Sequence, residues 1–198
     1  MPNHPHRRDH GQWLFHWTRA QDEQTAYEVL SSILSERTLR ASSTCIRGGF
    51  QCVCFTETPV FETTAYFAPS AAGGPPRYEP YGIAVRKDWL FARGGRPVIY
   101  ESNRDFDFLP PQLAWRHCRY EPGTIDFTWE REWRICGDLP LDPSETIVVA
   151  PTYEEAAELL QLSPDTEVIG VVDGSPDWGP LYVWKVVSLE LLLGNNAL

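Results

Sequence analysis

Short apolar runs, each bounded by Gly, Pro or polar residues, recur along this chain and limit what it can fold into. Runs of this length that are rich in β-branched and aromatic residues are typical of strands. We expect strands at 12–18, 50–55, 81–85, 97–100, 146–150, 167–172 and 182–192, and an extended segment at 124–136. The pattern therefore predicts an α+β fold with more strand than helix.

Helical patterns are fewer. An amphipathic stripe predicts a helix over 22–36, and the T-x-x-E pattern of a capping box predicts another over 152–162. We expect short helices at 89–93, with Asp88 as its cap, and at 110–118, after a pair of prolines. The Pro- and Gly-rich stretch 68–80 predicts a loop.

The chain has 198 residues, of which 42% are hydrophobic and 13% aromatic, and this suits one globular domain with a substantial core. No repeat or linker divides it, so we expect a single domain over 11–198 and a flexible tail over 1–10. No apolar run approaches the roughly 20 residues that a membrane helix needs. The first eleven residues contain no apolar segment, which excludes a secretory signal. We expect a cytoplasmic protein with no membrane partner.

The formal net charge is −10 and is unevenly placed along the chain. Residues 137–198 contain eleven acidic residues and one basic residue, whereas residues 1–136 are neutral overall. This balance excludes a globally basic surface for nucleic acid. The acidic third is either a face for a basic partner or an aid to solubility, and we favour the second interpretation. A local basic patch stays open as a prediction, from Arg37, Arg40, Arg47, Arg86, Lys87, Arg93 and Arg96.

The five cysteines include no C-x-x-C pair, and their number is odd. We interpret them as reduced, mostly buried thiols, and we expect no metal site. The three histidines of the first ten residues are interpreted as part of a polar tail.

Two strand segments end in residues that suit a pocket. In the first, His16 and Thr18 share one side of the strand, and the choice is between a ligand-orienting histidine and a hydrogen-bonded histidine in an aromatic strand. In the second, Phe55 and Thr56 would give an aromatic wall and a hydroxyl, unless they merely end the strand. Ser43 is a weaker candidate of the same kind.

The third candidate cluster is the charged run from 129 to 134. In an extended conformation Glu130, Glu132 and Arg134 share one face, and Arg134 or a substrate would offset the repulsion between the two carboxylates. A carboxylate here suits the binding of ribose hydroxyls and the stabilisation of an oxocarbenium-like transition state. The alternative is a solvated charged strand between packed tryptophans.

In order along the chain, these clusters resemble the ADP-ribosyltransferase superfamily: a strand with His, a strand ending F-T-E and a late E-x-E. More narrowly, FHWT, ILSERTLRAS, VCFTETP, YGIAVRKDWLFARGGRPVIY and WEREWRI resemble the bacterial abortive-infection family of the AbiGi type, over residues 13–150. DarT-type DNA-modifying enzymes are more distantly similar. The resemblance implies a split β-sheet core with a few flanking helices, NAD as co-substrate and no metal.

The resemblance also implies roles for residues. Glu132 would stabilise positive charge at the anomeric carbon, and Glu130 would orient or deprotonate the acceptor. The implied NAD-binding residues are His16 and Thr18 for ribose or amide, Thr56 or Ser43 as the middle-strand hydroxyl, Phe55 or Tyr66 for stacking, and Arg134 or Arg40 for the pyrophosphate.

The function that this resemblance implies is NAD-dependent mono-ADP-ribosyl transfer by a toxin or phage-defence effector. The acceptor stays open between protein, nucleic acid and water, the last being NAD glycohydrolase activity, and a cognate antitoxin or toxin partner is implied. The alternative is a non-enzymatic antitoxin or sensor with the same fold. A relative of NAD-dependent RNA 2′-phosphotransferases is disfavoured, because the expected early His with several Arg is not visible.

Overall fold

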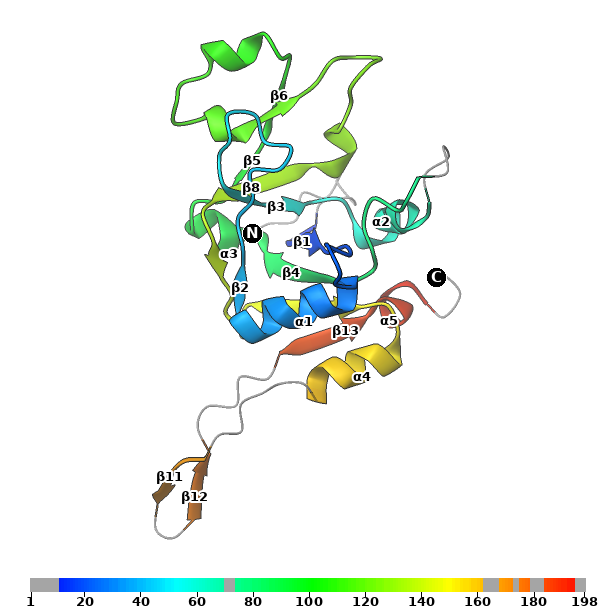
Figure 1. Ribbon diagram of the computed structural model, residues 1–198, viewed down its shortest axis with the longest axis vertical. Helices are drawn as coiled ribbons and strands as arrows, with labels where there is room; N and C mark the ends of the chain where they lie inside the picture. Colours follow the sequence, from blue (N-terminus) through cyan, green and yellow to red (C-terminus); the bar gives the residue numbers. More distant parts are fainter. Residues whose placement is uncertain (1–10, 70–73, 162–167, 173–174, 179–183, 195–198) are drawn as a thin grey trace.

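The computed structural model describes the chain apart from residues 1–10, 70–73, 162–167, 173–174, 179–183 and 195–198 (Figure 1). The expected tail at 1–10 therefore lies outside the described residues.

A seven-stranded sheet forms the centre of the fold, as the α+β prediction requires (Figure 1). All its neighbouring strands are antiparallel except β13, which runs parallel to β10. In spatial order the strands are β13 (Lys185–Ser188), β10 (Thr146–Ala150), β4 (Gly82–Arg86), β1 (Trp13–Trp17), β3 (Cys52–Thr56), β8 (Glu132–Cys136) and β5 (Arg96–Pro97).

Helices contribute to two apolar clusters, one on each face of the sheet. The larger cluster joins Leu14 of β1 to apolar residues of α1 (Ala26–Glu36), α3 (Lys87–Ala92) and α4 (Tyr153–Gln161). The smaller cluster joins Trp17 of β1 to α2 (Val60–Phe67) and α5 (Leu189–Leu193). Because side chains alternate along a strand, Phe15 and Trp17 face α2 and α5, whereas Leu14 and His16 face the larger cluster.

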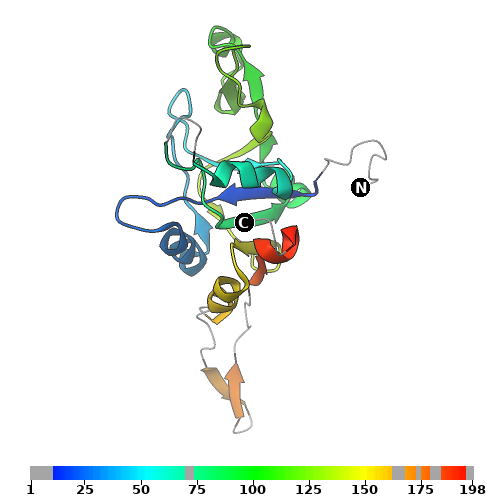
Figure 2. The ribbon, with the colours of Figure 1, turned by 90° about the vertical axis from the view of Figure 1, so that its right-hand side faces the viewer.

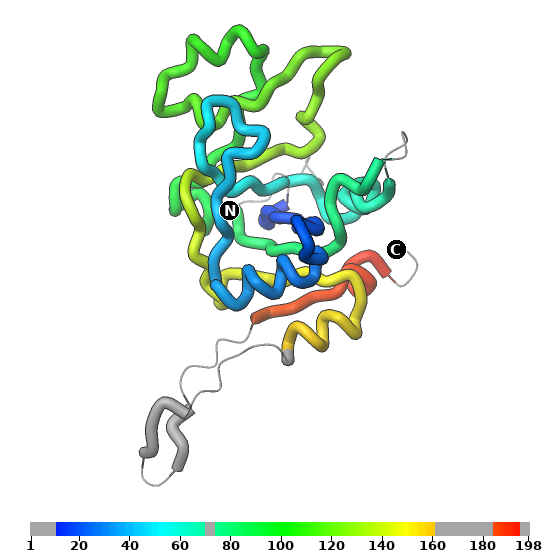
Figure 3. Tube along the Cα trace, viewed as in Figure 1, coloured from blue at the N-terminus to red at the C-terminus, as the bar shows by residue number. Residues whose placement is uncertain are grey.

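Three smaller two-stranded sheets complete the described strands: β2 (Thr38–Leu39) with β9 (Leu139–Pro140), β6 (Ile99–Glu101) with β7 (His117–Arg119), and β11 (Val168–Val172) with β12 (Ser175–Trp178). Short 3-10 turns lie at η1 (Asp105–Phe108), η2 (Ala114–Arg116) and η3 (Thr128–Glu130). Figures 2 and 3 place the segment around β6 and β7 at the end of the molecule away from α4 and α5.

Side-chain caps decide where the longer helices begin. The Thr25 side chain accepts a hydrogen bond from the backbone of Glu28, whose carboxylate accepts one from the Thr25 backbone, so α1 begins at Ala26 rather than near residue 22. The expected capping bond of α4 is confirmed, because the Glu155 backbone N–H donates to the Thr152 hydroxyl.

Several expectations about elements are wrong. Asp88 does not cap the short helix α3, because this helix begins at Lys87 after Arg86 and Asp88 lies within its first turn. Residues 110–118 form only the turn η2 before β7 pairs with β6. The expected strand at 182–192 ends at Ser188, because the Ser188 hydroxyl caps α5 by accepting from the Leu191 backbone. Helix α2 follows Pro59, where only a strand end was expected, because Pro suits the start of a helix.

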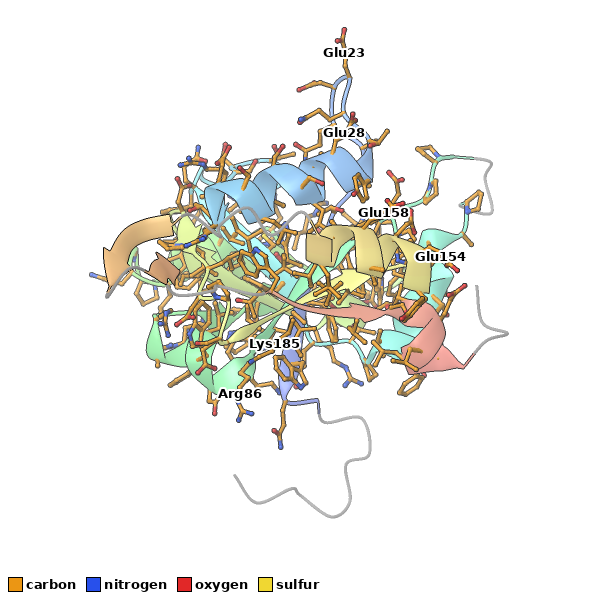
Figure 4. The ribbon with its side chains drawn as sticks, turned by 90° about the horizontal axis from the view of Figure 1, so that it is seen from below. Glu23, Glu28, Arg86, Glu154, Glu158 and Lys185 are labelled. Atoms are coloured by element: carbon orange, nitrogen blue, oxygen red, sulfur yellow. The ribbon has the colours of Figure 1, made fainter. Side chains whose placement is uncertain are left out.

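Glu155 of the acidic last third contacts residues from elsewhere in the chain. The Tyr81 hydroxyl donates to Glu155 of α4 at 2.6 Å, and the Tyr81 ring also contacts Tyr27 of α1 edge-on. Tyr81 therefore links α1 to α4. Figure 4 shows the labelled acids of both regions on one side of the molecule and the labelled bases on the other: Glu23, Glu28, Glu154 and Glu158 against Arg86 and Lys185.

Among the described residues, no helix has the length and apolar character needed to span a membrane, and no group of three or more His, Cys, Asp or Glu is placed to hold a metal ion. All five cysteines are unpaired. Cys52 and Cys136 lie opposite each other on β3 and β8, with their sulfur atoms 3.8 Å apart.

We predict that Gly82→Ala destabilises the fold by about 1–3 kcal/mol, because the added methyl group forces apart a close-packed contact. A Cβ at Gly82 would lie 2.7 Å from the His16 carbonyl oxygen and 2.8 Å from the Trp17 ring. Gly11→Ala is the matched control, since its Cβ meets nothing closer than 3.6 Å. Urea unfolding of both variants measures the difference, and equal stability would contradict the prediction.

Candidate active site

A pocket of about 90 Å³ opens where β1, β3 and β8 meet. Its wall consists of strand residues together with Tyr78 from the loop before β4 and Glu130 from η3. The lining residues are Phe15, His16, Trp17, Cys54, Phe55, Thr56, Tyr78, Glu130 and Glu132.

The pocket exists because the sheet is split between β1 and β3. These two strands share a single ladder pair, Phe15 with Thr56, whereas β1 with β4 and β3 with β8 each pair at five positions. Beyond the Phe15 position the strands diverge, so His16 from one face of β1 and Trp17 from the other both line the same space.

His16 bridges this split. Its Nδ1 lies 2.8 Å from the Cys54 carbonyl oxygen, and since a carbonyl only accepts, Nδ1 carries the proton. Burial lowers the pKa of His16, with the Cys54 hydrogen bond opposing the change. The imidazole is therefore neutral at pH 7, and its Nε2 is a hydrogen-bond acceptor.

Glu132 begins β8 and is held by Arg134 two residues later on the same face, as the strand spacing predicts. The Arg134 Nε and a terminal nitrogen donate to the two Glu132 oxygens at 2.7 and 3.1 Å. This bidentate geometry fixes the carboxylate in orientation as well as position.

Arg134 is not placed to hold a pyrophosphate, so that expectation is wrong. Its side chain is 4% exposed, and its remaining terminal nitrogen donates to the carbonyl oxygens of Trp115 and His117 at 3.0 and 2.8 Å. Burial alone lowers the pKa of Arg134, but Glu132 raises it overall, so the guanidinium stays charged. Arg134 is a positioning residue for Glu132.

Glu130 lies in the turn η3 and not on the strand, which corrects the expectation of an extended run. Arg131 follows with φ of 46°, the left-handed conformation that ends the turn and starts β8. The Thr56 hydroxyl donates to the Glu130 carbonyl, and the Thr58 hydroxyl donates to the Trp129 carbonyl. The end of β3 thus fixes the turn, and both carboxylates line the pocket.

Arg77 pairs with Glu130 at the edge of the pocket, with its Nε 2.7 Å from a carboxylate oxygen. The Arg77 guanidinium also lies 5.1 Å from the Phe127 ring centroid and 5.5 Å from that of Trp129. Burial is the largest influence on Glu130 and raises its pKa; Arg77 opposes the rise and Glu132 adds to it.

Several expected site residues lie outside the pocket. The Thr18 hydroxyl donates to the Tyr81 carbonyl at 3.0 Å, so it supports the loop and not a ligand. Ser43 lies in the turn before β3, where its carbonyl accepts from the Ile46 backbone, and Thr56 is the hydroxyl that lines the pocket. Tyr66 packs against Trp129, with ring centroids 4.3 Å apart and an interplanar angle of 39°. Arg40 pairs with acids elsewhere.

Sequence reasoning missed Phe15, Trp17, Cys54 and Tyr78 of the lining, and Arg77 beside it. Trp17 belongs to the same aromatic strand as His16, but strand alternation assigned it to the apolar face. Arg77 and Tyr78 lie in the predicted loop, where no periodicity marks which residues point inward. The available signal was the sequence pair Arg77-Tyr78 after two prolines, because a cation next to an aromatic residue in a loop is a candidate for the wall of a site.

Comparison with known proteins gives one structural similarity. No protein-family model matches the chain, and no curated protein matches it. A solved structure of Thermus sp. 2.9 DarT in complex with NAD+ is similar, with a TM-score of 0.40 and 11% identity over 76% of this chain and 87% of that chain. DarT-type enzymes are among those that the sequence resembles, but this TM-score is too low to carry a functional argument. The narrower AbiGi-type resemblance gains no support.

We predict that Arg134→Met lowers the free energy of unfolding by about 3–5 kcal/mol, because it leaves the Glu132 charge buried without its charged partner. The double variant Arg134→Met, Glu132→Gln removes both charges and regains most of that loss. Chemical denaturation of the three proteins tests this. If the single and double variants are equally unstable, the packing of Arg134 matters and its charge does not.

Proposed function

We propose that this protein is an NAD-dependent ADP-ribosyltransferase whose active site is the pocket between β1, β3 and β8. One observation carries the proposal: two buried carboxylates, Glu130 and Glu132, and a neutral histidine, His16, line one aromatic-walled space at a split in the sheet. The sequence resemblance to the superfamily supports the same residues in the same order.

The lining suits a flat aromatic cation such as the nicotinamide end of NAD. Phe15, Phe55 and Tyr78 supply rings for stacking, and the carboxylates favour positive charge. The pocket, at about 90 Å³, is smaller than the roughly 150 Å³ cavity that holds benzene in an engineered core. Binding therefore requires the pocket to widen. Tyr78 is the part of the wall that can move most easily, because it lies in a loop and not on a strand. The rest of NAD extends outside it.

NAD supplies the ADP-ribose group and nicotinamide as the leaving group. His16 accepts a hydrogen bond at Nε2 from a ribose hydroxyl and fixes its orientation. Glu132, held by Arg134, presents its negative charge in a set position to the positive charge that develops at the anomeric carbon. Preorganised charge of this kind acts without reorganisation during the reaction.

Glu130 is the base for the acceptor. Burial raises the pKa of Glu130 toward neutral pH, and a general base works best when its pKa is close to the pH of the reaction. The Arg77 guanidinium occupies one carboxylate oxygen in this structure, so the acceptor has to displace or share that contact. We propose a macromolecular acceptor, protein or nucleic acid, with water as the hydrolytic alternative.

In biological terms we propose a cytoplasmic toxin or phage-defence effector with a cognate antitoxin, in line with the AbiGi-type resemblance of residues 13–150. The small pocket and the Arg77–Glu130 pair favour a second candidate, a sensor or antitoxin that binds NAD without turnover. Nicotinamide release separates the two.

We predict that Glu132→Gln lowers nicotinamide release from NAD by about 10²–10³-fold, the usual effect of removing one preorganised electrostatic contact. Glu57→Gln is the matched control: Glu57 is also largely buried, but it pairs with Lys87 and Trp133 outside the pocket, so its variant keeps the activity. Release is measured with and without cell extract, and circular dichroism checks the fold.

Three outcomes decide between the candidates. Release by the wild type that depends on extract identifies a transferase, and release without extract identifies a glycohydrolase. NAD binding without release under any condition supports the sensor. An unchanged rate in Glu132→Gln would overturn the assignment of Glu132.

We predict that Arg77→Gln moves the acid limb of the rate–pH profile to higher pH. Arg77 opposes the rise in the pKa of Glu130, so its loss raises that pKa further. The active form of a base is deprotonated, and activity therefore disappears at a higher pH as the solution is acidified. Arg40→Gln, which removes an exposed pair outside the pocket, is the control and leaves the limb in place. A shift to lower pH would contradict the role of Glu130.

A further inference from the structure

Trp17 carries a buried donor without a partner. Its side chain is 6% exposed and lines the pocket, and within the described part of the chain its Nε1 has no hydrogen-bond partner. Buried N–H groups are almost always satisfied in native proteins, because an unmade hydrogen bond costs free energy. A donor of this kind at the wall of a ligand pocket points to the ligand as its partner.

The indole is fixed in place and does not turn to find another acceptor. Its ring stacks on Phe15 with centroids 5.3 Å apart and an interplanar angle of 3°, and Phe67 contacts it edge-on at 5.1 Å. Gly82, its ladder partner on β4, approaches so closely that even a methyl group would not fit. The donor is therefore held in one orientation before any ligand arrives, and because it is buried, a ligand reaches it only when the pocket widens.

The other polar side chains of the pocket leave this donor without a rival. His16 Nε2 and the two carboxylates are acceptors. The Thr56 hydroxyl already donates to the Glu130 carbonyl. The Tyr78 hydroxyl and the Cys54 thiol lie beside the carboxylates of Glu130 and Glu132, which compete with a ligand for their protons. A ligand with a carbonyl oxygen in the pocket can therefore accept a hydrogen bond from the Trp17 Nε1–H.

We infer that the Trp17 Nε1–H is a ligand-binding donor that selects for a carbonyl-bearing aromatic group. The inference rests on the proposed function, which makes that group the nicotinamide ring and the acceptor its carboxamide oxygen. Trp17 is then a specificity-determining residue: it distinguishes nicotinamide from a ring of similar size that lacks the carbonyl.

A second tryptophan provides the control. Trp89 is also buried, at 8% exposure, and its Nε1 likewise has no partner among the described residues, but its ring packs beneath Arg93 and does not line the pocket. A Phe substitution at either position removes the same N–H from the same kind of burial. Only the position differs.

The experiment compares the binding of nicotinamide and of 3-methylpyridine, which lacks the carbonyl, to the wild type, Trp17→Phe and Trp89→Phe by calorimetry. We expect Trp17→Phe to weaken nicotinamide binding by about fivefold to tenfold, the usual worth of one hydrogen bond, and to leave 3-methylpyridine unchanged. Trp89→Phe leaves both unchanged.

Nitrogen-15 NMR of the indole N–H groups reports the same contact in the unaltered protein. The eight tryptophans give separate side-chain signals, and the one missing from Trp17→Phe is that of Trp17. We expect nicotinamide, but not 3-methylpyridine, to move this signal downfield. If Trp17→Phe fails to fold, benzothienylalanine at position 17 keeps the ring shape and removes only the N–H.

The outcomes separate the inference from the proposed function. Equal weakening of both ligands, or a Trp17 signal that nicotinamide does not move, overturns the inference and leaves the function standing. If neither nicotinamide nor NAD binds the wild type, the proposed function fails and the inference fails with it.

Discussion

The buried ion pair between Glu132 and Arg134 connects the candidate site to the rest of the structure. Removing two charges from water is costly unless each finds several partners. Arg134 meets that demand by donating to the carbonyls of Trp115 and His117, in the segment that leads from η2 into β7. The segment around β6 and β7 is therefore needed at the site although it contributes no lining residue, since it supplies the carbonyls that keep the pair in place.

The two carboxylates are two residues apart and yet have different surroundings. Glu132 is fixed on a strand by a buried guanidinium, whereas Glu130 sits in a turn and meets Arg77, which is 46% exposed. Separate environments are how neighbouring acids acquire separate roles. The division depends on the left-handed Arg131, which turns the chain between them. A continuous strand would have given both carboxylates the same face and the same partner.

The parts of this arrangement that depend on local pattern could be predicted from the sequence. The strand at 146–150 follows from a short apolar run rich in β-branched residues, and the capping of α4 follows from the T-x-x-E spacing. The shared face of Glu132 and Arg134 follows from the period of a strand. The turn at Glu130 could not be predicted, because a non-glycine residue in the left-handed conformation leaves no local signature. The roles of Arg77 and Tyr78 depend on how a loop folds back, which long-range packing decides.

The contact between Trp17 and Gly82 has a consequence for finding relatives of this protein. The two residues face each other across the β1–β4 ladder, and the indole fills the space that a side chain on β4 would occupy. A large ring at position 17 therefore requires glycine at position 82, and a side chain at position 82 would require a smaller residue at position 17. In an alignment of divergent sequences, the two columns should change together. Such paired substitution marks the wall of the pocket. It can be detected even between sequences whose overall identity is too low to show common descent.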